Sequence, residues 1–153
     1  MAMVITLDNI LLDELENRVS DTYWSDIIKT KTLSDEVTDK YFDRLIPEGL
    51  FENQTVSINV IEKHIKDITE YELNLICKNQ ELTEDFIERH LDIFSEENIE
   101  TICEFQILHD EFINQYFDLF SNRDLEKILD NQEEISEDLF IRIEKVLQLN
   151  GII

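Results

Sequence analysis

The chain has 153 residues, of which 42% are hydrophobic, and it contains only two glycines and one proline. This scarcity of turn residues argues against hairpin-rich β folds and glycine-rich phosphate loops, and the length fits one domain with a continuous core. Thirty-six acidic residues against 13 basic ones give a formal net charge of −23, which disfavours direct binding to nucleic acids or anionic membranes and favours basic protein partners.

The first residues, MAMVITLDNILLDELEN, lack a basic segment before an apolar one and lack a small-residue cleavage pattern. No segment approaches the roughly 20 apolar residues that span a bilayer. Two cysteines without a recognisable framework agree with a reducing compartment. We therefore expect a cytoplasmic protein.

One sequence pattern recurs about every 26 residues along the chain. Its six copies are LDNILL, LSDEVT, VSINVI, LTEDFI, LHDEFI and ISEDLF, which start at residues 7, 33, 56, 82, 108 and 135. Counting the first residue of each copy as position zero, apolar residues at positions four, five, eight, nine and twelve follow one face of a helix. This stripe predicts the first helix of each repeat. Position four holds Leu11, Val37, Val60, Phe86, Phe112 and Leu139, and position twelve holds Val19, Leu45, Ile68, Phe94, Phe120 and Leu147.

Residues that favour helix N-termini predict where two helices begin in each repeat. The first helix should start after position one and the second after position thirteen. Thr69 with Glu72 has the pattern of a capping box, and Ser121 with Asp124 is a shorter version of it. The predicted caps are Asp8, Ser34, Ser57, Thr83 and Ser136 for the first helix, and Ser20, Thr69, Ser95 and Ser121 for the second.

The second helix of each repeat is predicted to bury two apolar columns and to end beside a glutamine. We expect the glutamine amides to bond backbone groups of the turn between repeats. The columns are Trp24, Leu73, Ile99 and Leu125, then Ile27, Ile76, Ile102 and Ile128, and the glutamines are Gln54, Gln80, Gln106 and Gln132. The register breaks once, at residues 46–55, where the second helix is short and Pro47 fits its first turn.

These patterns predict an all-α fold, an α-solenoid of about five to six helix-turn-helix repeats of about 26 residues in a single domain, 1–153. The segments LTEDFIERHLDIF and ILHDEFINQYFDLF resemble the short helical-hairpin repeats of large DNA phages and giant viruses. The resemblance implies a helical array of phage or viral type. It implies no activity and no catalytic residue.

Two histidines and two cysteines occupy equivalent positions in different repeats. His64 and His90 are at position eight, and Cys77 and Cys103 are at position twenty-one. A zinc site needs four converging ligands, whereas other repeats place Tyr, Ile or Leu at these positions, so we interpret them as packing residues. Motifs of hydrolases, metalloproteases, nucleotide-binding loops and calcium loops are absent. We therefore predict no catalysis, no metal and no cofactor.

Acidic residues at positions three, six and ten are predicted to form an acidic outer face that binds a basic protein, such as a nucleic-acid-binding enzyme, or mimics a phosphate array. A solvated surface without a binding role is the plain alternative. Phe105 breaks its polar column and is either an exposed partner anchor or a gap filler. The predicted partner-binding residues are Glu36, Asp39, Asp43, Asp85, Glu88, Asp92, Glu104, Phe105, Glu111 and Asp118.

The functional hypothesis is a non-catalytic, phage- or virus-type inhibitor that occupies the basic nucleic-acid-binding surface of a host defence protein. Its alternative is an adaptor that holds a peptide in the groove between helix layers. The first would bind with strong dependence on salt, and the second with little. Oligomeric state stays open, because apolar segments at both ends can pair with another copy or fold back.

Overall fold

The computed structural model describes residues 4–15, 20–132 and 135–152. It consists of two compact bodies, the N-terminal body (Met1–Leu75) and the C-terminal body (Ile76–Ile153). The described residues form twelve α-helices, which confirms the all-α class. The boundary between the bodies falls within one helix, α7 (Glu70–Asn79), and the single-domain organisation stays a prediction.

The N-terminal body contains a short strand pair that the repeat pattern does not predict. Its strands, β1 (Val4–Ile5) and β2 (Thr32–Leu33), are parallel, and the Ser34 N–H extends the pairing to the Ile5 carbonyl at 3.0 Å. Ile5 and Leu33 are buried, so the pair ties the start of the chain to the second repeat. The helices of this body are α1 (Leu7–Leu15), α2 (Asp21–Thr30), α3 (Asp35–Lys40), α4 (Phe42–Leu45), η1 (Ile46–Glu48), α5 (Leu50–Asn53) and α6 (Ile58–His64).

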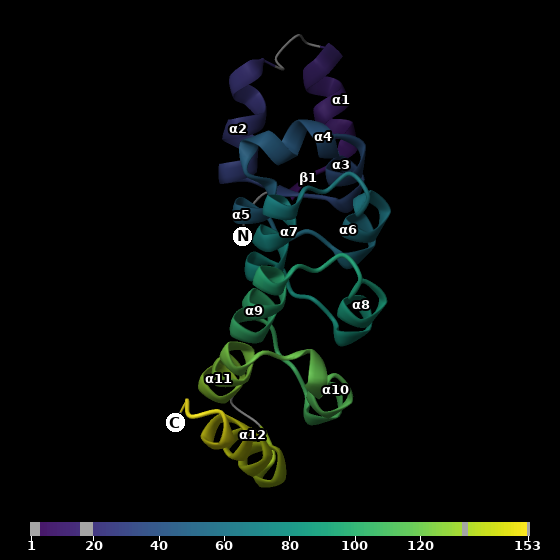
Figure 1. Cartoon of the computed structure of the whole chain (residues 1–153). Helices are drawn as coiled ribbons and strands as arrows, with labels where there is room; N and C mark the ends of the chain where they lie inside the picture. The colour runs from purple at the N-terminus through teal and green to yellow at the C-terminus, as the bar shows by residue number, and fades with distance from the viewer. Residues whose placement is uncertain (1–3, 16–19, 133–134, 153) are drawn as a thin grey trace. The chain divides into compact units, whose positions relative to one another are not determined.

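The C-terminal body alternates first and second helices of the repeats. Its second helices α9 (Glu96–Phe105) and α11 (Asn122–Asn131) pack on each other, and α11 packs on α12 (Glu137–Leu149). Figure 1 shows α9 and α11 following one another in a row, with α8 (Glu84–Arg89) and α10 (Asp110–Gln115) in a second row beside them. A 3-10 turn, η2 (Phe117–Leu119), follows α10.

The first helices are shorter than the apolar stripe predicts. α8 and α10 have six residues each and end where position eight, His90 or Tyr116, leaves helical geometry with ψ of 16° or 19°. Each of these rings packs on the position-four phenylalanine of its own repeat, with centroid distances of 4.7 Å for Phe86–His90 and 4.8 Å for Phe112–Tyr116. α12 has Ile143 at position eight instead and continues for 13 residues. The prediction of one helix across positions four to twelve is therefore wrong in the inner repeats, where α3, α6, α8 and α10 end at or just before position eight.

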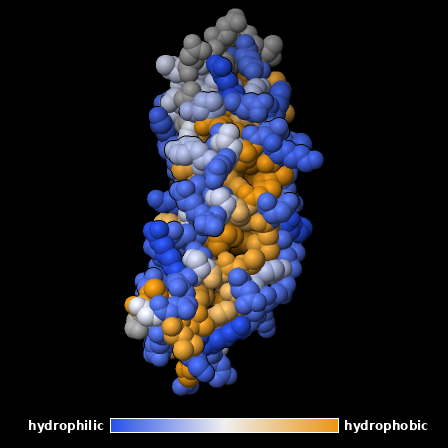
Figure 2. All heavy atoms as spheres, viewed as in Figure 1, coloured by the Kyte–Doolittle hydropathy of each residue, from blue (hydrophilic) through white to orange (hydrophobic). Residues whose placement is uncertain are grey.

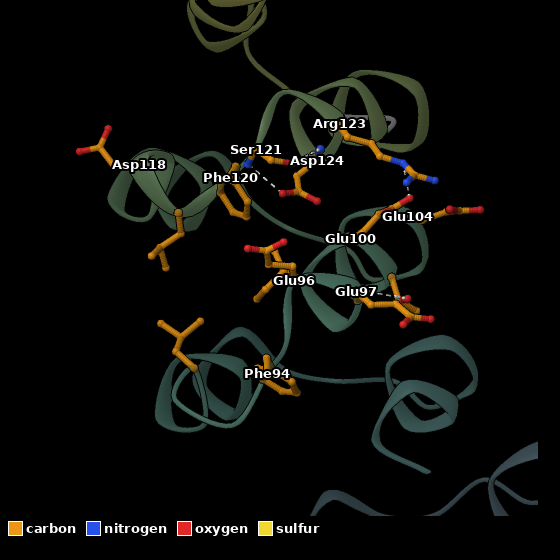
Figure 3. Close-up of a pocket in the computed structure, with 14 residues that line it drawn as sticks. Phe94, Glu96, Glu97, Glu100, Glu104, Asp118, Phe120, Ser121, Arg123 and Asp124 are labelled. Atoms are coloured by element: carbon orange, nitrogen blue, oxygen red, sulfur yellow. Dashed lines mark hydrogen bonds and ion pairs between the residues drawn. The ribbon is translucent and has the colours of Figure 1, made fainter. Parts of the chain in front are cut away.

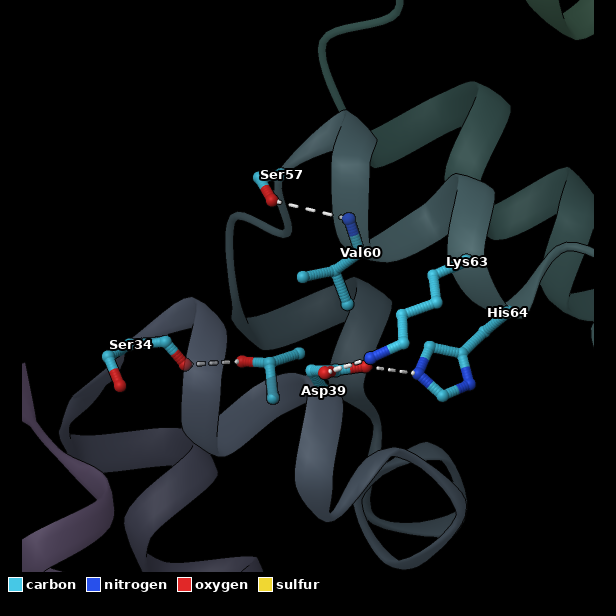
Figure 4. Close-up of polar contacts among 7 residues, drawn as sticks. Ser34, Asp39, Ser57, Val60, Lys63 and His64 are labelled. Carbon is cyan, nitrogen blue, oxygen red and sulfur yellow. Dashed lines mark hydrogen bonds and ion pairs between the residues drawn. The ribbon is translucent and has the colours of Figure 1, made fainter.

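Most predicted caps are confirmed. The hydroxyls of Ser34, Ser57, Thr83 and Ser136 each accept a hydrogen bond from the backbone N–H three residues on, as Figure 4 shows for Ser57. Capping boxes form at Thr69–Glu72, Ser95–Asn98 and Ser121–Asp124.

Two caps differ from the prediction. Asp8 is not a cap, because α1 begins one residue earlier and Asn9 Oδ1 accepts from the Thr6 N–H and hydroxyl instead. Ser20 is the N-cap residue of α2 but makes no side-chain capping bond, and its hydroxyl lies 3.2 Å from the Thr22 hydroxyl.

The predicted core stripe is mostly buried, with exceptions that matter for the site. Position four is buried in the second to sixth repeats, but Leu11 of the first is 37% exposed and Ile10 is buried in its place. Val19 lies outside the described residues. Four predicted core residues of the C-terminal body are only half-buried: Leu91, Phe94, Ile99 and Phe120.

Three of the four predicted glutamines, Gln54, Gln106 and Gln132, bond backbone groups as predicted. Gln106 is buried, its Nε2 donates to the carbonyls of Cys77 at 2.7 Å and Gln80 at 2.8 Å, and its Oε1 accepts from the Leu82 N–H at 2.8 Å. Gln132 makes the same three bonds one repeat later, and Gln54 makes them in the N-terminal body. One side chain thus satisfies carbonyls at the end of one second helix and fixes the turn that follows.

The irregular segment at residues 46–55 has the predicted proline-initiated turn. Pro47 lies in the first turn of η1, and Gly49 ends it with φ of +86°. A Cβ at Gly49 would also lie 2.9 Å from side-chain atoms of Asn53 and Glu52. Glycine is therefore required here, since other residues rarely adopt this backbone conformation.

Candidate protein-binding surface

The predicted acidic face does not form along one helix, because the first helices end before position ten. Asp43 lies in α4, Asp118 in η2, and Asp92 in the turn after α8. The position-three acids do lie on first helices and are exposed: Glu36, Asp85 and Glu111. Asp85 forms an ion pair with Arg89 at 3.3 Å.

Position-six acids contact the following repeat. In the N-terminal body Asp39 accepts a hydrogen bond from Lys63 and lies 2.8 Å from His64 Nε2 (Figure 4). The His64 ring also stacks on Phe42, with a centroid distance of 4.0 Å. In the C-terminal body the Tyr116 hydroxyl and the Gln115 amide both donate to Glu88. Asp39 and Glu88, which the sequence pattern assigns to partner binding, therefore hold neighbouring repeats together. Their role toward a partner stays a prediction.

The contacts of Asp39 give a pH-dependent prediction. Its hydrogen bonds with Lys63 and His64 hold the pKa of this carboxyl below its usual range. A lowered folded-state pKa stabilises the protein above the ordinary value of about 3.9, and this stabilisation is lost as pH falls through the folded-state pKa. We expect Asp39→Asn to lower the free energy of unfolding by about 0.5–1 kcal/mol at neutral pH, with no deficit at acidic pH. Urea unfolding at several pH values measures this, with exposed Asp43→Asn as the control.

Two ion pairs connect the second helices of the C-terminal body. Arg123 of α11 pairs with Glu100 of α9 at 2.8 Å, and Lys127 pairs with Glu104 at 2.6 Å. The hydrogen bond to Glu104 raises the pKa of Lys127. Glu104, a predicted binding residue, is thus partly neutralised within the protein.

Phe105 is 46% exposed beside these pairs, and Lys78 Nζ lies 5.3 Å from its ring centroid. Phe105 is therefore an exposed aromatic residue, and its role as a partner anchor stays a prediction.

A groove in the C-terminal body brings acidic and apolar side chains together. It has a volume of about 870 Å³ and lies between α9, the start of α11 and the turns that follow α8 and α10. In Figure 3, Phe94 and Phe120 approach the space from opposite sides, Glu96 lies between them, and Asp118 lies at the edge and points away. The charged residues that line the groove are Glu96, Glu97, Glu100, Glu104, Asp118, Asp124 and Arg123.

The groove exists because the first helices end early. Leu91, Phe94 and Phe120 occupy apolar stripe positions, yet they lie in turns after α8 and η2 and stay half-buried. Ile99, the one residue of the second-helix columns that is not fully buried, faces the same space. Figure 2 shows hydrophobic side chains at the surface over α8–α11, with polar side chains on either side. A continuous first helix would have placed these side chains in the core.

Four groove acids were not predicted as binding residues: Glu100, Asp124, and the pair Glu96 and Glu97 at the start of α9. The position of Glu96 and Glu97 in the first turn gives them a plain structural explanation, because acids there stabilise the helix dipole. The signal that could have found them is the run EENIETICE, which places four glutamates within nine residues.

The cysteines are packing residues, as predicted. Cys77 and Cys103 are free thiols and are fully buried. Burial raises the pKa of Cys77 to about 12, and burial together with Asp124 and Glu100 raises the pKa of Cys103. Both thiols are therefore protonated and unreactive at neutral pH.

In the part of the chain that the structure describes, no group of three or more His, Cys, Asp or Glu side chains is arranged to hold a metal ion. Within the same residues, no helix combines the length and apolar character needed to cross a membrane.

We compared the chain with known proteins and found no relative. No protein-family model matches the chain, and neither curated proteins nor solved structures include a match.

Proposed function

We propose that the chain is an α-solenoid of five to six repeats that acts as a non-catalytic binding protein. Its acidic surface occupies the basic nucleic-acid-binding surface of another protein, in the manner of a phage or viral inhibitor of a host defence protein. The observation that carries the proposal is the charge of residues 79–153, which contain 20 acidic and five basic residues. Pairing within this stretch cannot neutralise such an excess, and the resulting field attracts basic surfaces.

The proposal rests on net charge and not on a copy of phosphate spacing. B-DNA offers one charge per about 1.7 Å of axis. The acids of this chain do not form one continuous row, since position ten leaves the first helix and position six contacts the next repeat. Competition for a basic surface needs only complementary charge, which also speeds association.

The alternative function is an adaptor that holds a peptide in a groove. The apolar side chains of the groove, Phe94 and Phe120 among them, favour it. An adaptor that relies on apolar contact alone would bind with little dependence on salt.

The test is capture of binding proteins from a host lysate at low and high salt, followed by competition. Each captured protein is purified and loaded with a fluorescent DNA or RNA duplex, and release of the duplex by this protein is measured. We expect release that weakens as salt rises. A partner that keeps its duplex, or binds equally at all salt concentrations, contradicts the proposal.

Charge reversal tests which surface is responsible. The variant Asp92→Lys/Glu111→Lys/Asp118→Lys changes three exposed acids of the C-terminal body and spares Asp39 and Glu88. We expect roughly 30-fold weaker binding, since each exposed ion pair contributes about 0.2–1 kcal/mol and reversal adds repulsion. The control reverses three exposed acids of the N-terminal body, Asp26, Glu52 and Asp67, with the same change in net charge. Equal losses in both variants would indicate nonspecific attraction.

A further inference from the structure

We propose that the groove of the C-terminal body binds a segment of the basic partner in which an aliphatic or aromatic side chain is flanked by Lys or Arg. This inference rests on the proposed function and adds the place of contact and the chemistry of the segment. Two features of the groove carry it: an exposed apolar lining and an excess of carboxylates around that lining.

The apolar lining of the groove is partly exposed to solvent. Leu119 is 56% exposed at the end of η2, and Phe94, Phe120 and Leu91 are half-buried beside it. Removing these side chains further from water is favourable, with a free energy of about 25 cal/mol per Å² of apolar surface buried. A bound segment with only charged side chains would leave these apolar side chains exposed to water. The lining therefore favours a segment with an apolar anchor.

The charged side chains around the lining determine which charge a bound segment should carry. Six carboxylates and one guanidinium line the groove. Asp124 is buried and accepts from the Ser121 N–H as part of a capping box, so it serves the fold. Glu100 and Glu104 are held by Arg123 and Lys127, whereas Glu96, Glu97 and Asp118 are exposed. An anionic segment would be repelled by the excess of carboxylates around the groove, whereas a cationic segment is attracted to them.

The size of the groove fits a short segment. Its volume of about 870 Å³ lies in the range of roughly 300–1,000 Å³ for pockets that take drug-sized ligands. A few side chains fill such a space, while the rest of the partner stays outside and contacts the acidic surface. Nucleic acid is disfavoured by its charge.

The test uses the full chain and a fluorescent synthetic peptide of Lys and Leu, with Leu at the i, i+3, i+4, i+7 spacing of an amphipathic helix. A second peptide has every Leu replaced by Ser and keeps the same charge. Binding is measured by fluorescence anisotropy. We expect the Lys/Leu peptide to bind more tightly, and Leu119→Ser to weaken it roughly tenfold, as the loss of one partly buried leucine corresponds to about 1.4 kcal/mol.

The matched control is Ile141→Ser on α12, since Ile141 is 53% exposed and does not line the groove. It should change the affinity less than twofold. Equal affinity of Leu119→Ser and the parent protein, or equal binding of the two peptides, overturns the groove as the site while leaving charge-driven capture intact. Failure of the natural partner to respond to charge reversal contradicts the proposed function itself, so the two outcomes are distinguishable.

Discussion

Replacing Gln106 by leucine should lower the free energy of unfolding by roughly 3–5 kcal/mol, although leucine has a similar size and the position is buried. The amide makes three hydrogen bonds to backbone groups of the preceding turn. Its loss leaves one N–H and two carbonyls without that partner, and each buried unsatisfied group costs about 1–3 kcal/mol. Relaxation of the turn recovers part of this cost. The expected loss is a large share of a typical domain stability of about 5–15 kcal/mol.

Urea unfolding followed by far-UV circular dichroism measures the effect. Gln132→Leu should cost less, because Gln132 is partly exposed and water can replace its bonds. Gln148→Leu, on the exposed side of α12, should stay within about 0.5 kcal/mol of the parent protein. A Gln106 variant as stable as the Gln148 variant would show that the turn holds its conformation without the amide.

The features that the sequence predicted correctly depend on near neighbours along the chain or on strict repetition. Caps such as Ser57 and Thr83 act on a backbone N–H three residues away, so the local pattern determines them. Gln54, Gln106 and Gln132 contact a distant turn, yet their recurrence at one position of the repeat made a shared role visible. The short turn at Pro47 and Gly49 could be predicted for the same reason, because it depends on residues that are close together in the sequence.

The features that it did not predict depend on competition between segments. The stripe from position four to position twelve is compatible with a longer helix, and α12 forms one. In the inner repeats, the packing of His90 on Phe86 and of Tyr116 on Phe112 accompanies the end of the helix instead. The strand pair of Val4–Ile5 with Thr32–Leu33 joins segments far apart in the sequence and too short for a periodic signal.

The candidate site was only partly predictable for the same reason. Glu104 and Asp118 were predicted and do line the groove. Asp39 and Glu88 were chosen from the same spacing, but their neighbours in the next repeat, His64 and Tyr116, bond to them. The repeat spacing predicts which residues lie outside the core. It does not predict which of them contact the next repeat.

The last repeat offers a test of how the repeats stabilise one another. Position five is fully buried at Ile87 and Ile113, but Phe140, at the same position of the last repeat, is 40% exposed. We infer that the following repeat helps to bury position five in the inner repeats, and that α12, with no second helix after it among the described residues, leaves this position partly open. In the first repeat the equivalent residue, Leu12, is 54% exposed.

Ile113→Asp should therefore cost at least about 5 kcal/mol, because it removes a core side chain worth roughly 2–5 kcal/mol and buries a charge. Phe140→Asp should cost only about 1–2 kcal/mol, since its side chain is partly solvated and the carboxylate can reach water. Both substitutions add one negative charge, so the change in net charge does not account for their difference. Urea unfolding, with hydrogen exchange to locate the loss, measures both. Equal costs at the two positions would mean that Phe140 is covered as fully as position five of the inner repeats.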